Sequence, residues 1–336
     1  MTNNIRSAIA RLSCSIFRVL VATMVCLSPC GAVFAQQQAP SGGQAQSAAK
    51  TSVAEDDLKY ETLKVRKEGA VLFVEIAAPP MNLLGPELVR DLVSLIQRAE
   101  ADNAVKVLVF KSADPDYFIS HVDVTKIKEY REEAAKLVGE PSIGLLVRPL
   151  SASRLVTIAQ IEGRVRGAGS EFVLACDMRY AALGSAIFGQ PEPGLGTIPG
   201  AGAVQHLTRL MGRARALEVL LSADDYDAEL AERYGWINRA LPARSLDGFV
   251  RSLAHRIARF PAPGLVAVKE RVNAIALAPT EDFRRDSDLF GEGVRKPEAQ
   301  SQLQAAVKRG FQTRDAEMDL GQLLGELAAQ DGEIEH

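Results

Sequence analysis

The chain has 336 residues, enough for one large domain or two ordinary ones, and its apolar content of 47% supports a real hydrophobic core. The formal net charge is −3, and no basic run is interleaved with aromatic residues, so the composition does not favour a nucleic-acid-binding protein. The four histidines, at positions 121, 206, 255 and 336, lack metal-ligand spacing, so no metal site is expected.

The first 35 residues have the pattern of a secretory signal peptide. Arg6, Arg11 and Arg18 precede the apolar stretch VLVATMVCLSP, and the small residues Val33 and Ala35 fit cleavage after Ala35. We therefore expect export, to the periplasm, with no stable membrane span after cleavage. Two alternatives stay open: a lipid anchor near the end of this segment, and a start codon assigned too early in front of a cytoplasmic protein.

Cleavage there would change what remains of the chain. It would leave 36 basic against 42 acidic residues, and Cys176 as the one cysteine, so no internal disulfide is expected. Residues 36–57 are largely small and polar and are interpreted as a flexible linker.

Ordered structure is expected from residue 58, beginning with strands that alternate with helices. The pattern predicts a hairpin over 62–79, a helix over 85–102 and a strand over 105–112. A charged amphipathic helix over 123–138 and a strand over 154–163 follow. The remaining elements up to the last strand are a helix starting within 170–176, a strand over 177–183, helices over 200–212 and 213–222, and a strand over 235–242.

Beyond this point the sequence predicts helices only, over 247–259, 263–278, 281–290 and 297–309, and then a loose acidic helix or tail over 315–336. Alternating strands and helices followed by a helical block indicate an α/β fold with a helical C-terminal region. We place the core at 58–250 and a helical region, expected to serve oligomerisation, at 251–336.

The stretch RVRGAGSEFVLACD at 164–177 raises the question of what Glu171 does. A strand, a glycine-rich turn and a helix would direct backbone N–H groups outward at the helix start, but the P-loop and dinucleotide spacings are absent. The stretch is not a G-x-S-x-G motif either. Taken alone, Glu171 is better explained as a first-turn acid that complements the helix dipole.

A second stretch, FGQPEPGLGTIPGAG at 188–202, places Glu192 between two prolines. A carboxylate braced in this way is held stiffly, although an ordinary solvated loop acid is the simpler explanation for the residue by itself.

Together these stretches resemble the enoyl-CoA hydratase/isomerase (crotonase) superfamily over about residues 60–310. The order G-x-G-x-E, C-D, Q-P-E, G-x-x-P-G-A-G and a late G-W-I-N strand carries the resemblance, with PPMNLLGPELVRDL and YFISHVDV as weaker matches. It implies a spiral of ββα turns ending in helices, assembled as a homotrimer or a dimer of trimers. An acyl-CoA or similar thioester would be the substrate, with coenzyme A part of that substrate and no separate cofactor.

The resemblance also implies roles for individual residues. Glu171 and Glu192 match the two glutamates that hold and activate water in hydratases of this family, and the N–H groups of Val122 and Ala168 match the oxyanion hole. Two preorganised donors would stabilise the negative charge on a thioester oxygen, and two neighbouring acids have pKa values pushed apart. The substrate-binding residues expected from the matching loops are Asn82, Phe118, Ser120, His121, Gly169 and Pro199.

Three departures from the family pattern qualify this expectation. Ala168 replaces a common glycine, and His121 stands where a glycine is usual, as a polar wall, a third acid/base group or an outward-packed ring. Basic residues that would meet the CoA phosphates are few, with Lys126, Lys128 or Lys269 as candidate substitutes.

The expected activity is hydration of an α,β-unsaturated acyl thioester. Alternatives are an isomerase or hydrolase of the same fold, possibly on an exported substrate without CoA, and a non-catalytic exported scaffold, because fold resemblance alone does not fix function.

Overall fold

The computed structural model describes residues 59–331, all of which belong to one of the two compact units into which the chain divides, residues 54–336. The expected signal peptide and nearly all of the expected linker lie outside the described residues. Within 59–331 no helix is both long and apolar enough to cross a membrane.

A six-stranded sheet forms the centre of this unit, in the order β1-β2-β3-β5-β7-β10, and only β1 runs antiparallel to its neighbour. Its central strands are buried on both faces, as expected for parallel strands covered by helices. Val71 and Phe73 of β2 pack towards α7 (Ala243–Ala258), whereas Leu72 and Val74 face the larger core on the other side. The strands are β1 (Leu63–Glu68), β2 (Val71–Ile76), β3 (Val107–Ser112), β5 (Val156–Ile161), β7 (Met178–Ala182) and β10 (Arg239–Leu241).

A smaller sheet has the order β4-β6-β8-β9, and its first three strands are parallel. The chain alternates between the sheets, because β3, β5 and β7 of the large sheet are each followed by a strand of the small one and then by helix. This alternation confirms the predicted ββα spiral. The strands are β4 (Tyr117–Ile119), β6 (Arg164–Arg166), β8 (Ile187–Gly189) and β9 (Asp225–Asp227).

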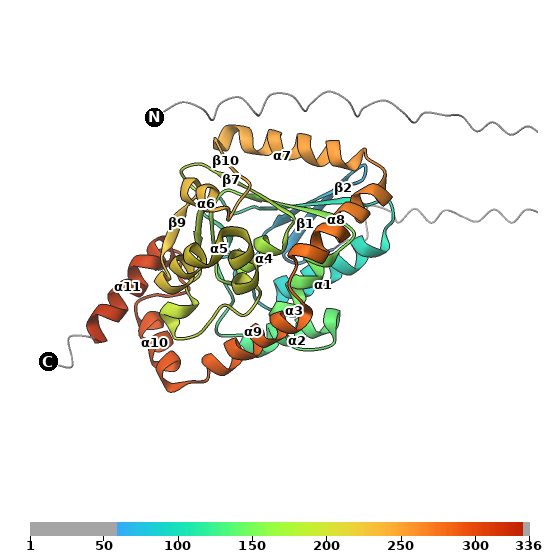
Figure 1. The fold of residues 1–336 in the computed structure, drawn as a ribbon. Helices are drawn as coiled ribbons and strands as arrows, with labels where there is room; N and C mark the ends of the chain where they lie inside the picture. Colours follow the sequence, from blue (N-terminus) through green and yellow to red (C-terminus); the bar gives the residue numbers. More distant parts are fainter. Residues whose placement is uncertain (1–58, 332–336) are drawn as a thin grey trace, which may run out of the picture. The chain divides into compact units, whose positions relative to one another are not determined.

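Helices fill the layers around the two sheets (Figure 1). The predicted break between the helices over 200–212 and 213–222 is confirmed at Gly212, whose φ of 78° interrupts α5. Trp236 is fully buried, whereas Leu221, near the end of the same helix as Gly212, is 70% exposed. The helices are α1 (Pro86–Ala101), α2 (Ile127–Val138), α3 (Ile143–Ala152), α4 (Ala168–Ala175), α5 (Ala203–Ser222) and α6 (Ala228–Tyr234).

Several elements are not among those predicted. The strands of the small sheet are three residues long, too short to show an alternating pattern. Helix α3 contains Pro149, which in a sequence indicates a helix end; its first turn is capped by Ser142, whose hydroxyl accepts a hydrogen bond from the N–H of Leu145 at 3.2 Å.

The predicted helical C-terminal region is confirmed, and most of it packs back onto the core. Helix α7 (Ala243–Ala258) covers one face of the large sheet, so the expected boundary at 250 falls inside it. Figure 1 shows α9, α10 and α11 on the opposite side of the molecule from α7. The remaining helical elements are α8 (Ala262–Ala276), α9 (Thr280–Gly293), α10 (Pro297–Lys308), the 3₁₀ turn η2 (Ala316–Asp319) and α11 (Leu320–Asp331).

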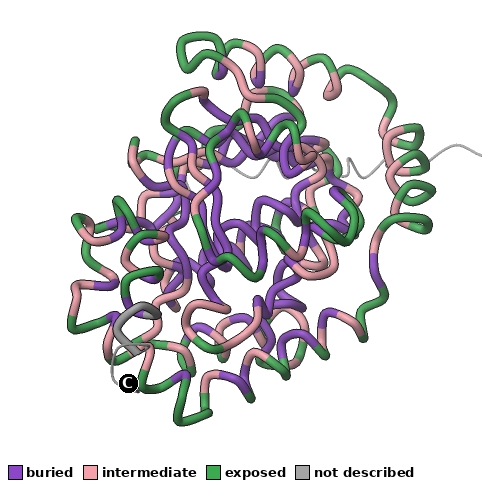
Figure 2. Tube along the Cα trace, turned by 60° about the vertical axis from the view of Figure 1, so that its left-hand side comes forward, coloured by how far each residue is buried: buried purple, intermediate pink, exposed green. Residues whose placement is uncertain are grey.

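Of the loose acidic helix or tail expected over 315–336, the helix is confirmed over Leu320–Asp331, but its described part is packed rather than loose. Leu320, Leu324 and Leu327 are at most 5% exposed and pack with Ala306 and Phe311 in a cluster of their own. Figure 2 shows buried positions concentrated in the middle of the trace and exposed positions along the coils at its edge.

Candidate active site

Three strand ends of the small sheet bring the predicted catalytic residues together. Strands β4, β6 and β8 are adjacent and parallel, so the segments that follow them leave the sheet at the same edge. Val122 lies three residues after β4, Ala168 begins α4 two residues after β6, and Glu192 begins the 3₁₀ turn η1 (Glu192–Leu195) three residues after β8. The topology thus explains why residues 70 positions apart in sequence meet.

The two predicted oxyanion donors line one cavity. The carbonyl of His121 accepts a hydrogen bond from the N–H of Leu84 at 2.8 Å. Because C=O and N–H point in opposite directions across a trans peptide, this bond turns the Val122 N–H away from Leu84. Ala168 is the first residue of α4, where N–H groups have no helical partner. Within residues 59–331 neither N–H donates a hydrogen bond.

Glu171 lies on α4, one turn after Ala168, and is 2% exposed. Its Oε1 accepts hydrogen bonds from the N–H groups of Ala201 (2.7 Å) and Ala203 (3.0 Å) at the start of α5. Burial raises the pKa of Glu171 to about 7, and these two backbone donors keep it from rising further. Near neutral pH this carboxyl is therefore poised between its two protonation states.

Glu192 is 8% exposed and lies between Pro191 and Pro193. Its Oε2 is buried and has no hydrogen-bond partner in the described part of the chain. Burial first, and then the charge of Glu171, raise the pKa of Glu192 well above its ordinary value. This raised pKa favours the neutral, proton-bearing form of Glu192, and the favourable effect is larger when Glu171 is ionised.

Both carboxyls open onto a cavity of about 180 Å³. Its remaining wall is mainly apolar and comes from α2, α3, η1, α9 and α10, so it shields the glutamates from bulk water. The apolar lining residues are Val124, Ile127, Ile143, Leu195, Phe290, Val294, Leu303 and Phe311. Such a site can hold a small apolar group against two acids and two N–H donors.

Of the six residues predicted to bind substrate, His121 lies in the cavity wall and the other five do not. Asn82 is buried and bridges the ends of β3 and β4, donating to Ser112 Oγ (2.8 Å) and the Phe118 carbonyl (3.0 Å). Ser120 Oγ donates to the Met81 carbonyl at 2.6 Å. For these residues the structure shows a role in holding the loops, and direct substrate contact stays a prediction.

The other predicted positions also serve packing. A Cβ on Gly169 would lie 2.1 Å from the Ile119 carbonyl oxygen, so glycine there permits α4 to approach β4. Phe118 is fully buried in the core, and Pro199 is buried in the loop before α5.

A buried polar network beside the cavity was not predicted. His121 Nε2 lies 2.8 Å from Glu317 Oε1, and Arg166 donates to the Glu317 carbonyl at 2.8 Å while pairing with Asp225 through two contacts of 2.6 Å. Arg166 and Glu317 are at most 1% exposed. Glu317 is hard to single out in the sequence because it lies in an acidic stretch; the leucines at 320, 324 and 327 were the available signal of packing.

The cations suggested as CoA-phosphate partners are differently placed. Lys269 is committed to Asp177 at 2.9 Å and to the Leu155 carbonyl at 2.7 Å, away from the glutamates. Lys126 pairs with Glu87 at 3.5 Å on the surface. Arg131 and Arg295, which the sequence did not single out, do line the cavity, and Arg131 Nε donates to the Pro141 carbonyl at 2.8 Å.

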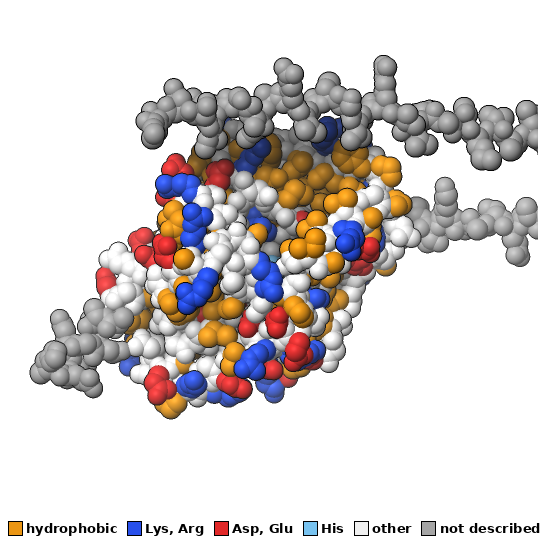
Figure 3. Space-filling view, viewed as in Figure 1, with side chains coloured by type: hydrophobic (Ala, Val, Ile, Leu, Met, Phe, Trp, Pro, Cys, Tyr) orange, Lys and Arg blue, Asp and Glu red, His pale blue; other side chains and the backbone are white. Residues whose placement is uncertain are grey.

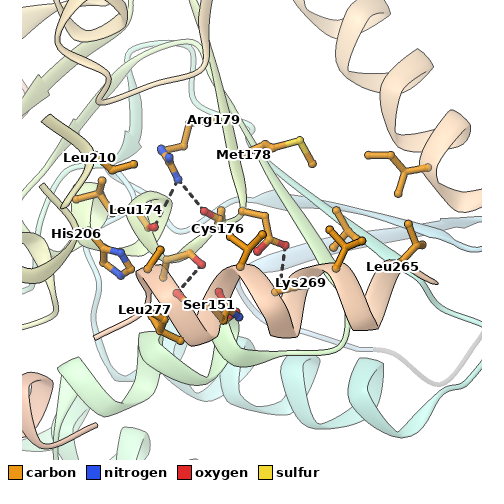
Figure 4. A pocket seen from close by; sticks show the side chains of 18 of the residues that line it. Ser151, Leu174, Cys176, Met178, Arg179, His206, Leu210, Leu265, Lys269 and Leu277 are labelled. Atoms are coloured by element: carbon orange, nitrogen blue, oxygen red, sulfur yellow. Dashed lines mark hydrogen bonds and ion pairs between the residues drawn. The ribbon is translucent and has the colours of Figure 1, made fainter. Parts of the chain in front are cut away.

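A second and larger cavity, of about 490 Å³, lies beneath α8 (Figure 4). Cys176, His206 and Lys269 line it, which as residue types would suit a nucleophilic site. Burial, however, raises the pKa of the Cys176 thiol to about 12 and lowers the pKa of His206 to about 3. The Cys176 thiol is therefore not activated for nucleophilic attack.

Comparison with known proteins shows the family of the chain. Residues 66–315 match the family model described as enoyl-CoA hydratase/isomerase. The short-chain-enoyl-CoA hydratase of Clostridium acetobutylicum is 30% identical over 76% of this chain and all of its own. The crotonyl-CoA hydratase of Syntrophomonas wolfei is 31% identical over 70% of this chain and 90% of its own.

Solved structures agree. A Streptomyces avermitilis protein described as a "putative enoyl-CoA hydratase" is 53% identical, with a TM-score of 0.78, over 79% of this chain and 97% of its own. Pseudomonas aeruginosa DspI is 26% identical, with a TM-score of 0.58, over 77% of this chain and 97% of its own. The family match, the relatives and the spiral fold agree: the chain belongs to the enoyl-CoA hydratase/isomerase family of enzymes, the crotonase superfamily.

Proposed function

We propose that this protein adds water across the C=C bond of an α,β-unsaturated acyl thioester. The observation that carries the proposal is the pair of buried glutamates, Glu171 and Glu192, facing the same cavity as two backbone donors that are unpaired within the described residues. The substrate class follows the relatives, whose names include short-chain-enoyl-CoA and crotonyl-CoA hydratases. Coenzyme A would be part of the substrate, and no separate cofactor is proposed.

The oxyanion hole supplies the first step. The thioester oxygen would accept hydrogen bonds from the N–H groups of Val122 and Ala168, which stabilise the negative charge that builds there as water attacks the β-carbon. Removing one such donor typically costs about 3–4 kcal/mol of transition-state stabilisation.

The two carboxyls divide the proton transfers. Glu171, kept partly ionised by the Ala201 and Ala203 N–H groups, suits the base that takes the proton of the attacking water. Glu192, whose pKa lies further above its ordinary value, suits the acid that protonates the α-carbon. In each turnover Glu171 gains one proton and Glu192 loses one. A proton transfer from Glu171 to Glu192, directly or through water, therefore restores the pair.

The test is loss of the conjugated-thioester absorbance when purified protein meets enoyl-CoA substrates of increasing chain length. Glu171→Gln and Glu192→Gln should each lower kcat by about 100- to 10,000-fold, the range of general acid–base catalysis. Glu132→Gln, on the exposed surface of α2, is the matched control and should keep full activity. Absence of turnover at every chain length would refute hydration, and activity that survives Glu171→Gln would favour isomerase chemistry.

We also propose that the protein assembles as a homotrimer or a dimer of trimers through its C-terminal region. Helix α8 has no buried residue, and it exposes Val268 (66%), Val272 (55%) and Ile275 (83%). Figure 3 shows hydrophobic side chains gathered around the hollow beside α8. An apolar helix face of this kind is typical of a surface covered in an assembly.

Light scattering during gel filtration tests the assembly. The natural chain should have three or six times the mass of one subunit, and Ile275→Asp should shift it to smaller species. A monomeric natural chain would refute the proposal.

Export is proposed from the first 35 residues, with a periplasmic location. A reporter active only outside the cytoplasm, fused after residue 60, should be active, and the N-terminus of the mature protein should be found after Ala35. A silent reporter with an unprocessed N-terminus would overturn export and favour a cytoplasmic protein with ordinary access to CoA.

A further inference from the structure

The ring of His121 lies between the oxyanion loop and the C-terminal segment. It is 3% exposed and stacks on Phe311, with ring centroids 4.6 Å apart and planes inclined by 12°. The main-chain carbonyl of His121 is fixed by the Leu84 N–H at 2.8 Å. This residue is therefore held both by its backbone and by its side chain, immediately before the oxyanion donor Val122.

Both ring nitrogens of His121 face hydrogen-bond acceptors. Nδ1 lies 2.7 Å from the carbonyl oxygen of Val122, and Nε2 lies 2.8 Å from Oε1 of Glu317. A carbonyl oxygen cannot donate, and an ionised carboxylate cannot donate either. If Glu317 is ionised, both ring nitrogens must carry a proton, and the ring is an imidazolium.

The surroundings of Glu317 favour its ionised form. Its Oε1 also accepts from the Gln312 N–H at 3.1 Å, and its Oε2 lies 3.8 Å from the Arg166 guanidinium. Burial opposes ionisation of Glu317, whereas the Gln312 N–H and the Arg166 guanidinium favour it, and both act independently of the charge on His121.

Charge balance points the same way. Arg166 already forms a two-point ion pair with Asp225, which leaves the fully buried Glu317 without a full counter-charge of its own. A protonated His121 makes the group neutral, with two cations and two anions, whereas a neutral ring would leave one buried carboxylate uncompensated. On the other side of Gly167, burial and the charge of Glu171 raise the pKa of Glu192 well above its ordinary value, which favours its neutral form.

We propose that His121 is a buried imidazolium held by Glu317, and that it is a positioning residue for the oxyanion hole. Its hydrogen bond to the Val122 carbonyl fixes the donor residue, and its positive charge favours the negative charge that develops on the thioester oxygen. The charge of His121 does not depend on the proposed function, whereas its effect on the thioester oxygen does.

The ring is close enough to the reacting groups for this role. Gly167 separates them: a Cβ on that residue would lie 3.2 Å from the His121 Cβ and 2.8 Å from Glu192 Oε1. His121 and the donor Val122 also line the cavity together. A charge at this distance in a site shielded from water is screened far less than one on the surface.

Nuclear magnetic resonance of the protein labelled with ¹⁵N-histidine tests the charge directly. The chain has four histidines, and loss of one signal set in His121→Gln assigns the ring. Between pH 6 and 8 the natural protein should show two protonated ring nitrogens at His121. In Glu317→Gln, whose amide can donate to Nε2 in the same space, the ring should show one protonated nitrogen.

Kinetics test the consequence. Glu317→Gln should lower kcat for enoyl-CoA hydration by about 10-fold or more, below the 100- to 1,000-fold typical of losing an oxyanion donor itself, and should change KM little. Glu317→Asp keeps the carboxylate and should retain more of kcat than Glu317→Gln. Glu68→Gln is the matched control, because Glu68 faces His255 at 3.1 Å on the α7 side of the molecule and should leave kcat unchanged.

Two results would overturn the inference: an unprotonated ring nitrogen at His121 in the natural protein, or an unchanged kcat in a Glu317→Gln protein whose ring has become neutral. If Glu317→Gln fails to fold, the natural protein's spectrum and the Glu317→Asp kinetics still decide. Because the spectrum needs no turnover, failure of the proposed hydration leaves the charge of His121 measurable, and a neutral ring leaves hydration intact.

Discussion

Gly167 offers the sharpest test of the site, because its φ of +48° and ψ of −129° suit glycine, and the space around it is filled. In Gly167→Ala the new Cβ would lie 2.8 Å from Glu192 Oε1 and 3.2 Å from the His121 Cβ. Real Cβ atoms essentially never approach other heavy atoms within 3.0 Å, so the Glu192 carboxyl must move. The substitution should therefore disturb both the backbone and the proposed acid.

The magnitudes separate these two effects. A residue with a side chain in so unfavourable a conformation costs about 1–3 kcal/mol of folding free energy. Displacement of a catalytic group by about 1 Å can cost about 100-fold in rate. Gly69→Ala is the matched control: φ is also positive, at +61°, but no atom of the described residues lies within 4 Å of its Cβ position.

Urea unfolding and the enoyl-CoA assay should be run on both variants. Gly167→Ala should lose at least as much unfolding free energy as Gly69→Ala, and only Gly167→Ala should lose activity, by about 100-fold in kcat. Equal activity in the two variants would show that the contact between Gly167 and Glu192 does not position the acid, and the assigned role of Glu192 would then fail.

Three further predictions concern stability. The pKa of Glu171 is raised in the folded state, so the fold loses stability as pH rises from about 4.5 to 7. Glu171→Gln removes this loss and should gain about 3 kcal/mol of unfolding free energy at pH 8 and little at pH 4, as measured by urea titration. Leu324→Ala removes a side chain that is 4% exposed and packs with Phe311, and it should cost about 2–5 kcal/mol of unfolding free energy in the same assay. It should also lower kcat, because the stack between Phe311 and His121 loosens, and an unchanged kcat would contradict that coupling. Lys269→Met leaves Asp177 without its cation and should cost about 3–5 kcal/mol of unfolding free energy. The KM for enoyl-CoA should not rise, and a raised KM would make Lys269 a contact of the CoA phosphates after all.

Much of the fold could be predicted from the sequence because its long elements have clear periodicity. The apolar residues of α1 repeat at helical spacing, and Gly212 ends one helix and begins another where the pattern changes. The small sheet could not be predicted in this way, because three-residue strands carry no alternation and are defined by partners distant in sequence. The spiral came from the family resemblance rather than from periodicity.

The candidate site likewise has one part that the sequence predicted and one part that it did not. Glu171 and Glu192 were identified from motifs that resemble the family, and the structure brings them to one cavity. Glu317 could not be found in that way, because its partner His121 is 196 positions away and the residue lies in a run of acids. Contacts between distant segments decide which acid is buried and paired, and a single sequence does not show those contacts.

The bracing of the oxyanion loop by Phe311 and Glu317 has a consequence for how the enzyme is made. Both sheets are complete by β10, which ends at Leu241, yet the side chains that enclose His121 arrive much later in synthesis, from the last part of the chain. A ribosome-bound chain could form its sheets and its glutamate-bearing turns while the oxyanion loop still lacked support. The segment from Phe311 to Glu317 therefore completes the enclosure of the oxyanion loop, and the site gains this support only after both sheets have been synthesised.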